Sequence, residues 1–146
     1  MTKGDHRVRD AMSKVVLTCR PEDDVLEAVA LMVHEGIRHV PVVAEDGHVI
    51  GMVSDRDVRD AIGDPAVALD ADSRHLERWP IADIMTRDPI TVRVDASLHS
   101  AAERMRKKGV GALVVVDRQG TLKGLLSYVD LLRHAYGAFK GSPRWA

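Results

Sequence analysis

Cysteine is nearly absent from this sequence, since Cys19 is the only one among its 146 residues. A single cysteine excludes an internal disulfide and any metal site built on several thiolates. Aromatic residues are also scarce, with two tryptophans, two tyrosines and one phenylalanine, so aliphatic side chains and methionine must form the core. Charge of one sign is not in excess either, because the formal net charge is −1. Without a basic surplus to hold a phosphate backbone, general nucleic-acid binding is not expected.

Sequence signals for secretion, membrane insertion and catalysis are missing too. The segment Thr2–Arg9 is polar and charged, and no apolar run approaches the length of a membrane span. We therefore expect a cytoplasmic protein without membrane attachment. The seven histidines are scattered without metal-ligand spacing, and no Ser/His/Asp set is suggested as a triad. No metal, cofactor or enzymatic activity is expected on these grounds.

The sequence contains an internal repeat at an offset of 73 residues, which needs no gap. Glycines and polar residues recur at this offset as well as apolar ones: Met12/Met85, Arg20/Arg93, Gly36/Gly109, Gly47/Gly120, Gly51/Gly124, Ser54/Ser127 and Asp57/Asp130. Chance similarity does not hold one register through so many such positions. We interpret the repeat as a duplication.

Each copy shows the same order of secondary-structure signals. A short helix is expected near Val8–Met12 and Ile81–Met85, followed by an extended segment at Val15–Thr18 and Ile90–Val92. A longer helix comes next, with N-cap candidates at its start and a glycine at its end: Asp23–Asp24 and Gly36 in the first copy, Asp95–Ser97 and Gly109 in the second. Two strands and a final helix complete the copy: Val40–Val43, Val49–Val53 and a helix from Ser54, then Leu113–Val116, Leu122–Leu126 and a helix from Ser127.

The expected domain organisation is a first repeat at 1–62, a linker at 63–79, a second repeat at 80–137 and a C-terminal tail at 138–146. Pro65 and several aspartates indicate the linker. The sequence does not decide whether the linker contains a short helix. One copy of about 55 residues buries too little surface to be comfortably stable alone. We therefore expect an α/β fold of the α+β kind, with two β-α-β-β-α copies packed sheet to sheet across a pseudo-twofold axis.

Two motifs recur in both copies and carry a family resemblance. The first copy has GIRHVPVV from Gly36 and GMVSDRD from Gly51, and the second has GVGALVVV from Gly109 and GLLSYVD from Gly124. Over about residues 8–135 the chain resembles a tandem pair of CBS domains (the cystathionine β-synthase type), called a Bateman module. The resemblance implies an adenosine-containing ligand in one or two clefts between the repeats: AMP, ADP, ATP, S-adenosylmethionine or NAD. No fused catalytic domain is expected, so any regulated partner is a separate chain.

The serine and aspartate of the second motif are the first site candidates. Ser54 and Asp57 are three residues apart at a helix start, as are Ser127 and Asp130, so both side chains of each pair face the opening of the same cleft. The resemblance assigns the two ribose hydroxyls to Asp57 and Asp130, while Ser54 and Ser127 can bond to ribose or phosphate. Free N–H groups at the helix start also favour an anion. The alternative, which the spacing alone favours, is N-capping beside a solvated aspartate.

Arg38, His39 and Arg56 are the candidates for phosphate. The resemblance places cations at Arg38 and His39, and Arg56 adds a second guanidinium beside Asp57. The alternative for Arg56 is a surface charge or a pair with a carboxylate.

The second copy lacks these cations, because Gly111-Ala112 and Tyr128-Val129 stand in their places. Three possibilities stay open for the cleft of Asp130. It borrows Arg38 or His39 from the other repeat, holds an uncharged nucleoside-like ligand, or stays empty.

The resemblance also implies that the first strand of the opposite repeat forms a wall against the base. For the cleft of Asp57 the wall residues are Ile90, Thr91, Val92, Ala112 and Leu113. For the cleft of Asp130 they are Leu17, Thr18, Cys19, His39 and Val40. The alternative is that these are core strands without ligand contact.

The leading functional expectation is a ligand-sensing module that regulates a partner. The alternative is a non-enzymatic dimerisation or interaction scaffold with no physiological ligand. A homodimer is expected because both final helices are apolar on more than one face: Val58, Ala61, Ile62, Leu131, Leu132 and Ala135.

Overall fold

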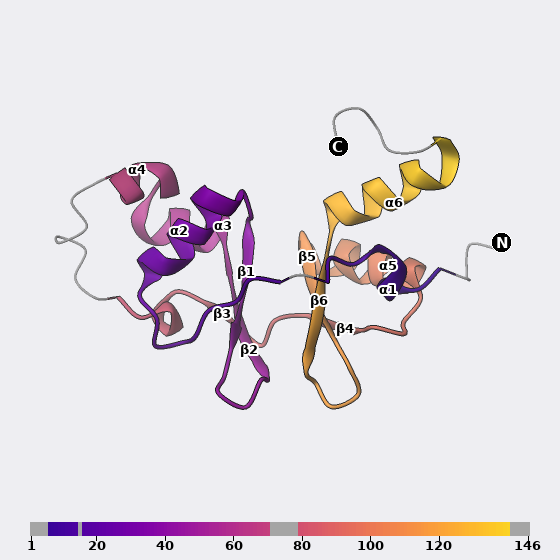
Figure 1. Cartoon of the computed structure of the whole chain (residues 1–146), viewed down its shortest axis with the longest axis horizontal. Helices are drawn as coiled ribbons and strands as arrows, with labels where there is room; N and C mark the ends of the chain where they lie inside the picture. The colour runs from indigo at the N-terminus through magenta and orange to yellow at the C-terminus, as the bar shows by residue number, and fades with distance from the viewer. Residues whose placement is uncertain (1–5, 15, 71–78, 141–146) are drawn as a thin grey trace. The chain divides into compact units, whose positions relative to one another are not determined.

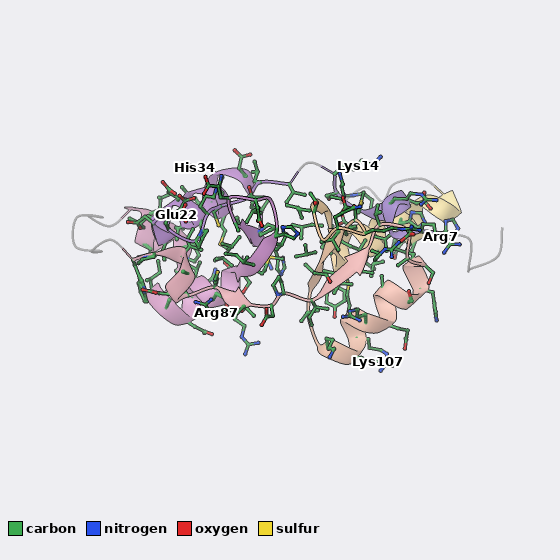
Figure 2. All side chains as sticks on the ribbon, turned by 90° about the horizontal axis from the view of Figure 1, so that it is seen from below. Arg7, Lys14, Glu22, His34, Arg87 and Lys107 are labelled. Carbon is green, nitrogen blue, oxygen red and sulfur yellow. The ribbon has the colours of Figure 1, made fainter. Side chains whose placement is uncertain are left out.

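The computed structural model describes residues 6–14, 16–70 and 79–140. The chain divides into two compact units, Leu17–Pro89 and Met1–Val16 with Ile90–Ala146. We call these the first and the second unit. The elements are labelled in Figure 1 and the side chains are drawn in Figure 2. Each unit combines one three-stranded sheet with helices, so the fold is of the mixed α+β class expected.

The first unit is built on an antiparallel sheet of order β1-β2-β3, formed by β1 (His39–Val43), β2 (Val49–Ser54) and β3 (Thr86–Arg87). In the β1–β2 hairpin His39 lies opposite Ser54, and Gly47 takes the positive φ of 92° that the turn needs. The helices of this unit are α2 (Val25–Glu35), α3 (Asp55–Ile62), α4 (Pro65–Asp70) and the 3-10 turn η2 (Ile81–Asp83).

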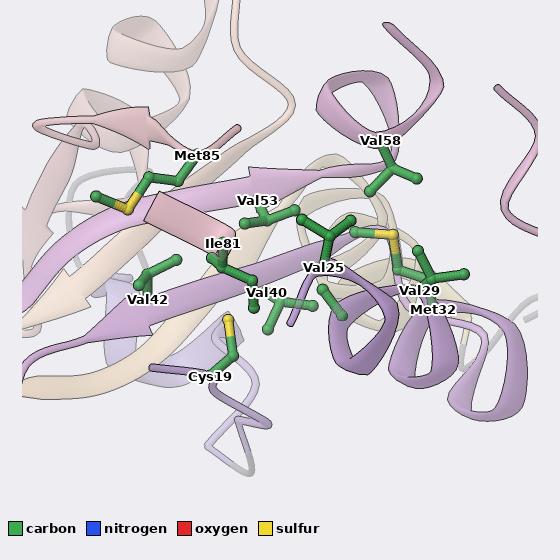
Figure 3. Close-up of a cluster of buried hydrophobic side chains, with 11 residues drawn as sticks. Cys19, Val25, Val29, Met32, Val40, Val42, Val53, Val58, Ile81 and Met85 are labelled. Carbon is green, nitrogen blue, oxygen red and sulfur yellow. The ribbon is translucent and has the colours of Figure 1, made fainter. Parts of the chain in front are cut away.

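Helix α2 has the start and the end that the sequence predicts. The Asp24 side chain accepts the Leu26 N–H at 3.0 Å, and Gly36 ends the helix with a left-handed φ of 67°. The buried face of α2 packs on the sheet, where Figure 3 shows Val25 and Val29 beside the strand residues Val40 and Val53. Burial of such aliphatic side chains stabilises the unit by about 1.5–3 kcal/mol for each.

The second unit repeats the plan with a parallel strand added. Its sheet has the order β4-β5-β6, in which β4 (Thr91–Arg93) is parallel to β5 (Ala112–Val116) and β6 (Leu122–Ser127) is antiparallel to β5. Its helices are α1 (Val8–Ala11), α5 (Leu98–Lys108) and α6 (Tyr128–Lys140). Ser97 caps α5 by accepting the Ser100 N–H at 3.1 Å. A second core forms around Met105, Leu113 and Leu126.

The opening segment of each repeat packs in the unit that holds the rest of the other repeat. Helix α1 belongs to the first repeat in sequence, yet Val8 N–H donates to Ala96 O at 2.9 Å and Val8 is buried in the second core. Conversely, Ile81 N–H donates to Asp23 O at 2.8 Å, and Figure 3 shows Ile81 and Met85 in the first core. The compact units therefore differ from the sequence repeats by an exchange of their opening segments.

Most predicted elements are confirmed, and several details differ. The segment at Ile81–Met85 is a 3-10 turn of three residues, and the following two residues form the unpredicted strand β3. Strand β4 begins one residue later than expected, at Thr91. In the first copy, residues 16–18 of the predicted extended segment form no strand, and Val15 lies outside the described residues. One parallel bridge, between Cys19 and Val42, comes directly after the segment.

The predicted linker and tail both contain helix. Helix α4 occupies part of the predicted linker, whose residues 71–78 lie outside the described part of the chain. Helix α6 runs to Lys140 and so enters the predicted tail, because a glycine such as Gly137 lowers helix propensity without ending a helix by itself. No helix in residues 6–14, 16–70 and 79–140 is long and apolar enough to cross a membrane.

Candidate functional site

Ser54 and Asp57 form a reciprocal cap at the start of α3. Ser54 is the last residue of β2, and its Oγ accepts the Asp57 N–H at 3.1 Å. In return, Asp57 Oδ2 accepts the Ser54 N–H at 2.9 Å and the Ser54 hydroxyl at 3.0 Å. The N-capping that the spacing alone favours is therefore present. The cap bonds use only Oδ2, one of the two carboxylate oxygens of Asp57.

The other oxygen of Asp57 is held from the opening segment of the second repeat. The Thr86 hydroxyl donates to Asp57 Oδ1 at 3.2 Å and lies 3.4 Å from Oδ2. A carboxylate oxygen has two lone pairs, so Oδ1 keeps capacity for a further donor. Asp57 is half-buried, in contact with its cap partners and with solvent.

Asp130 is the duplicate of Asp57 and is more fully engaged. Asp130 Oδ2 accepts the Ser127 N–H at 2.9 Å and the Ser127 hydroxyl at 3.1 Å, which repeats the cap. Asp130 Oδ1 accepts the Ser13 hydroxyl at 3.2 Å and lies 3.8 Å from Arg133 Nη1. The residue is 6% exposed. Both carboxylate oxygens therefore have two partners within the second unit.

Ser13 and Thr86 are site residues that the sequence analysis missed. They lie at the repeat offset of 73, directly after Met12 and Met85, and both carry a hydroxyl. The hydroxyl shared by these two duplicate positions was the one sequence feature that could have indicated a site role. Its partner could not be predicted, because the opening segments are exchanged and each hydroxyl contacts the aspartate of the other repeat.

Arg38 and Arg56 are exposed, and neither guanidinium has an ion pair or a side-chain hydrogen bond within the described residues. The Arg38 carbonyl accepts the Asp55 N–H at 2.8 Å, which ties this loop to the start of α3. Asp55 itself pairs with Arg59 at 2.8 Å and not with Arg56. Two cations of the first unit are thus available to an anionic ligand.

His39 differs from the expected cation. Burial lowers the pKa of His39 below its ordinary value of 6.5, and the Arg38 guanidinium lowers it further, against the opposing effect of Asp57 and Asp55. The imidazole is therefore neutral at pH 7. It can donate or accept one hydrogen bond, while Arg38 and Arg56 supply the positive charge.

The predicted wall residues fall into two classes of burial. Cys19, Val40 and Leu113 are buried in the two cores, which fits the core-strand alternative for their side chains. The others are exposed or half-buried: Leu17, Thr18, His39, Ile90, Thr91, Val92 and Ala112. Five wall residues lie in the first unit with Asp57, namely Leu17, Thr18, Cys19, His39 and Val40, and the other five lie in the second unit with Asp130.

Thr91 and Val92 also line a groove of about 600 Å³ along β4 and α5. Its basic side chains are Arg93, Arg104, Lys107 and Lys108. Arg93 is paired with Asp95 at 2.9 Å, whereas the other three have no ion pair within the described residues. The groove lies wholly within the second unit, and its lining also includes the acidic Glu103.

The Cys19 thiol is expected to be unreactive while the protein is folded. Burial raises its pKa to about 12, and Asp23 and Glu27 raise it as well. Because the thiolate is the nucleophile, only about one molecule in ten thousand is reactive at pH 8. Titration with Ellman's reagent should show no fast reaction in buffer and one equivalent in 8 M urea. One fast equivalent in buffer would contradict the burial of Cys19.

Comparison with known proteins places these features in a family. The family model described as CBS domain matches residues 8–64 and 81–137. A CBS domain-containing protein of Dictyostelium discoideum is 32% identical over 127 residues, which cover 86% of this chain and 88% of the relative. A homoserine O-acetyltransferase of Methanococcoides burtonii is 33% identical over 126 residues, 86% of this chain but only 23% of the enzyme. The chain likewise spans 32% of a longer relative from Methanocaldococcus jannaschii.

Solved structures agree with this assignment. CBSX2 in complex with AMP has a TM-score of 0.77 and 26% identity, covering 91% of this chain and 98% of that one. The CBS domain pair of protein MJ0100, in complex with 5′-methylthioadenosine and S-adenosyl-L-methionine, has a TM-score of 0.73 and 27% identity over 90% of this chain and 97% of that one. The chain belongs to the CBS-domain family and consists of a tandem pair of these domains.

Proposed function

We propose that this chain is a ligand-sensing CBS pair that binds an adenosine-containing ligand beside Asp57 and transmits binding to a separate partner. One observation carries the proposal. The first turn of α3 holds the Asp57 carboxylate, which has spare acceptor capacity, and the unpaired guanidinium of Arg56. The unpaired Arg38 lies in the loop that is hydrogen-bonded to this helix start. The AMP complex of CBSX2 and the methylthioadenosine and S-adenosylmethionine complex of MJ0100 support this class of ligand.

Each group has a distinct task in the proposed complex. Asp57 Oδ1 accepts hydrogen bonds from the ribose hydroxyls, since it is the carboxylate oxygen with fewer partners. Arg38 and Arg56 bind phosphate through charge-assisted hydrogen bonds, which contribute about 1.5–3 kcal/mol each. Neutral His39 contributes a hydrogen bond.

The duplicate site at Asp130 is proposed to bind nucleotides weakly or not at all. Its carboxylate is 6% exposed and already bonded to Ser13 and Ser127. The positions that hold Arg38 and Arg56 in the first copy are Gly111 and Val129 in the second. A nucleotide there would lack both a carboxylate with spare capacity for its ribose hydroxyls and the counterparts of Arg38 and Arg56 for its phosphate.

We propose a regulatory, non-catalytic role, and the bonding of the two carboxylates supports it. Asp57 and Asp130 are each bonded, within their own unit, to the serine of a helix cap and to a further hydroxyl. Relatives named as homoserine O-acetyltransferases are about four times longer than the matched region, since this chain spans 23% of their length. In those proteins a CBS pair accompanies further sequence, which supports a regulatory role for the pair.

The proposal predicts that a ligand of this class raises the melting temperature. AMP, ADP, ATP, S-adenosylmethionine, 5′-methylthioadenosine and NAD should be compared with GMP by thermal shift at 1 mM. A ligand that binds only the folded state adds about 2.7 kcal/mol when its concentration is 100 times the dissociation constant, which raises the melting temperature by several degrees. GMP, with a different base edge, is the matched control.

The main alternative is a scaffold that binds no physiological ligand, and an apolar face on α6 favours it. Equal melting temperatures with every adenosine compound and with GMP would support the scaffold and overturn the sensing proposal. In either case we propose that the chain is a homodimer.

A further inference from the structure

Strand β4 forms an open edge of the second sheet. The sheet has the order β4-β5-β6, so within the described residues β4 pairs with β5 alone. Val114 N–H donates to Ile90 O at 3.1 Å, and Val94 N–H donates to Val116 O at 3.0 Å. Alternate residues of a parallel strand bond to the same neighbour, so the residues in between direct their backbone groups to the open side.

Thr91 and Arg93 are the β4 residues whose backbone groups point to the open side. Arg93 C=O accepts the Ala96 N–H at 3.0 Å. The Arg93 N–H and both backbone groups of Thr91 have no hydrogen-bond partner within the described residues. Thr91 is half-buried and Arg93 is exposed. An unpaired strand edge of this kind is a template on which another chain can add a strand.

The groove along β4 and α5 follows this open edge. Thr91, Val92 and Arg93 all line it, although successive side chains of a strand point to opposite faces, and this is expected of a groove that follows the edge itself. Its other side is the face of α5 from His99 to Lys108, which is about 13 Å long at about 1.5 Å of rise per residue. About four residues of extended chain span the same length.

Basic side chains dominate the α5 side of the groove. Arg104, Lys107 and Lys108 are exposed, lie one turn apart on that face and have no ion pair within the described residues. Lys107 is labelled in Figure 2. The acidic member of the described lining, Glu103, pairs with Arg106 at 3.0 Å. Three cations are therefore available to the acidic side chains of an occupant.

The charge of the whole second unit acts in the same direction. Residues 1–16 and 90–146 contain fourteen lysines and arginines against six aspartates and glutamates, a net charge of +8. Residues 17–89 contain seven against sixteen, a net charge of −9. The overall charge of −1 conceals this separation. A net positive unit attracts an acidic partner before the groove itself is reached.

We infer that an acidic, extended segment of a partner protein adds as a strand to the open edge of β4, with its acidic side chains on Arg104, Lys107 and Lys108. Backbone pairing to Thr91 and Arg93 gives affinity, and ion pairs with α5 select the acidic sequence. A nucleic acid fits the groove less well. None of the described lining residues is an aromatic that could stack on a base, and the Thr91 carbonyl repels phosphate.

This partner surface goes beyond the proposed function and does not depend on it. Every described residue that lines the groove belongs to the second unit, whereas Asp57 and Arg38 belong to the first. Thr91 and Val92 are also predicted wall residues, so AMP binding is measured beside peptide binding in each experiment.

Fluorescence anisotropy with labelled eight-residue peptides tests the strand addition and the charge selection. The probe alternates glutamate and valine, one control has glutamine in place of glutamate, and the other carries N-methyl groups on alternate backbone amides. The glutamine peptide should bind about tenfold more weakly because it lacks the charges, and the N-methylated peptide about fivefold more weakly because it cannot pair with β4. No binding of the probe at 1 mM, or equal binding of the N-methylated peptide, would overturn the inference. Tighter binding of a twelve-residue oligothymidylate than of the probe would overturn it in favour of a nucleic-acid site.

Substitutions test the same surface from the side of the protein. Lys107→Glu should weaken the probe about tenfold, whereas Lys14→Glu, the same change at an exposed lysine of the second unit outside the groove, should change it less than about twofold. Thr91→Pro removes the outward N–H without removing a bond to β5 and should weaken the probe about fivefold. Urea denaturation verifies that each variant is folded, and the N-methylated peptide tests strand addition without any substitution.

The results separate this surface from the ligand site. Lys107→Glu should lose the probe and keep the AMP affinity of the parent. Equal losses of the probe in Lys107→Glu and Lys14→Glu would show attraction to net charge alone and would overturn the groove as the binding site. Probe binding without any AMP binding in the parent would support the partner surface and count only against the proposed ligand.

Discussion

Asp57→Ala is expected to remove most adenine-nucleotide affinity with little loss of stability, and Asp130→Ala is expected to do the reverse. The two aspartates occupy duplicate positions and make the same cap, so the lost cap bonds cancel in the comparison. What differs is the second carboxylate oxygen. Asp57 Oδ1 has one strong partner and spare capacity, whereas Asp130 Oδ1 has the Ser13 hydroxyl and Arg133 beside it.

The expected loss of affinity in Asp57→Ala exceeds tenfold. The carboxylate accepts from the ribose in the proposed complex, and a hydrogen bond to a charged group contributes about 1.5–3 kcal/mol. The same change at Asp130 leaves the cations Arg38 and Arg56 and the Asp57 carboxylate in place. Its effect on affinity should stay within threefold.

The expected loss of stability is larger in Asp130→Ala. The substitution leaves the half-buried Ser127 N–H without its acceptor in a site where Asp130 is 6% exposed, whereas the exposed Ser13 hydroxyl can bond to water instead. Unsatisfied buried groups cost about 1–3 kcal/mol each. Asp57 is half-buried, so water can replace the missing acceptor and the cost falls below about 1 kcal/mol.

Calorimetric titration with AMP at 25 °C and urea denaturation without ligand measure the two effects separately. Arg38→Ala is a useful companion, because it should weaken AMP much more than adenosine, and added salt should imitate part of that loss. Equal affinity losses in the two aspartate variants would refute the difference between the sites. Full affinity in both would refute the ribose assignment.

Gly124→Ala is expected to destabilise the second unit by about 3 kcal/mol, near the upper end for overpacking. Gly124 lies in β6, where the opening segment of the first repeat crosses it: Ser13 N–H donates to Leu125 O at 2.8 Å, and Leu125 N–H donates to Ser13 O at 3.0 Å. A Cβ on Gly124 would lie 2.6 Å from Ser13 O and 2.9 Å from Met12 Sδ. Relief of the first contact requires the backbone to move, which breaks this pair of hydrogen bonds.

Gly51→Ala is the matched control at the duplicate position. A Cβ on Gly51 would lie 2.5 Å from Met85 Sδ, the end of a flexible side chain, and 3.1 Å from Thr86 O. The methionine can rotate away, so the cost should be about 1 kcal/mol. Urea denaturation of both variants tests the difference. A larger loss in Gly51→Ala would show that the opening segment of the second repeat, and not that of the first, is the more tightly held.

The Gly124 substitution has a second consequence at Asp130. The strand pairing that Gly124 permits places the Ser13 hydroxyl on Asp130 Oδ1. Displacement of this segment removes that bond, so Gly124→Ala and Asp130→Ala should be less than additive in a double variant. Full additivity would indicate that Ser13 contributes nothing through Asp130.

Local elements were predictable because the forces that define them act within a few residues. Asp24 and Ser97 cap their helices, and Gly36 and Gly109 end them with left-handed backbone, as the sequence pattern predicts. The same holds for the Ser54–Asp57 cap, which needs only a spacing of three. The duplication supports these assignments, since each pattern occurs twice at the offset of 73 residues.

The sequence by itself determined the class of fold, the duplication and the residue types at each helix start. Tertiary structure decided which groups those residues meet. Ser13 reaches Asp130 and Thr86 reaches Asp57 because the opening segments are exchanged, and such long-range pairing leaves no local periodicity to detect. The charge of His39 likewise depends on burial and on the position of Arg38, both of which are set only by folding. The two Ser-x-x-Asp caps therefore have different environments, since a duplicated sequence specifies the hydrogen bonds within a turn but not the residues that pack against it.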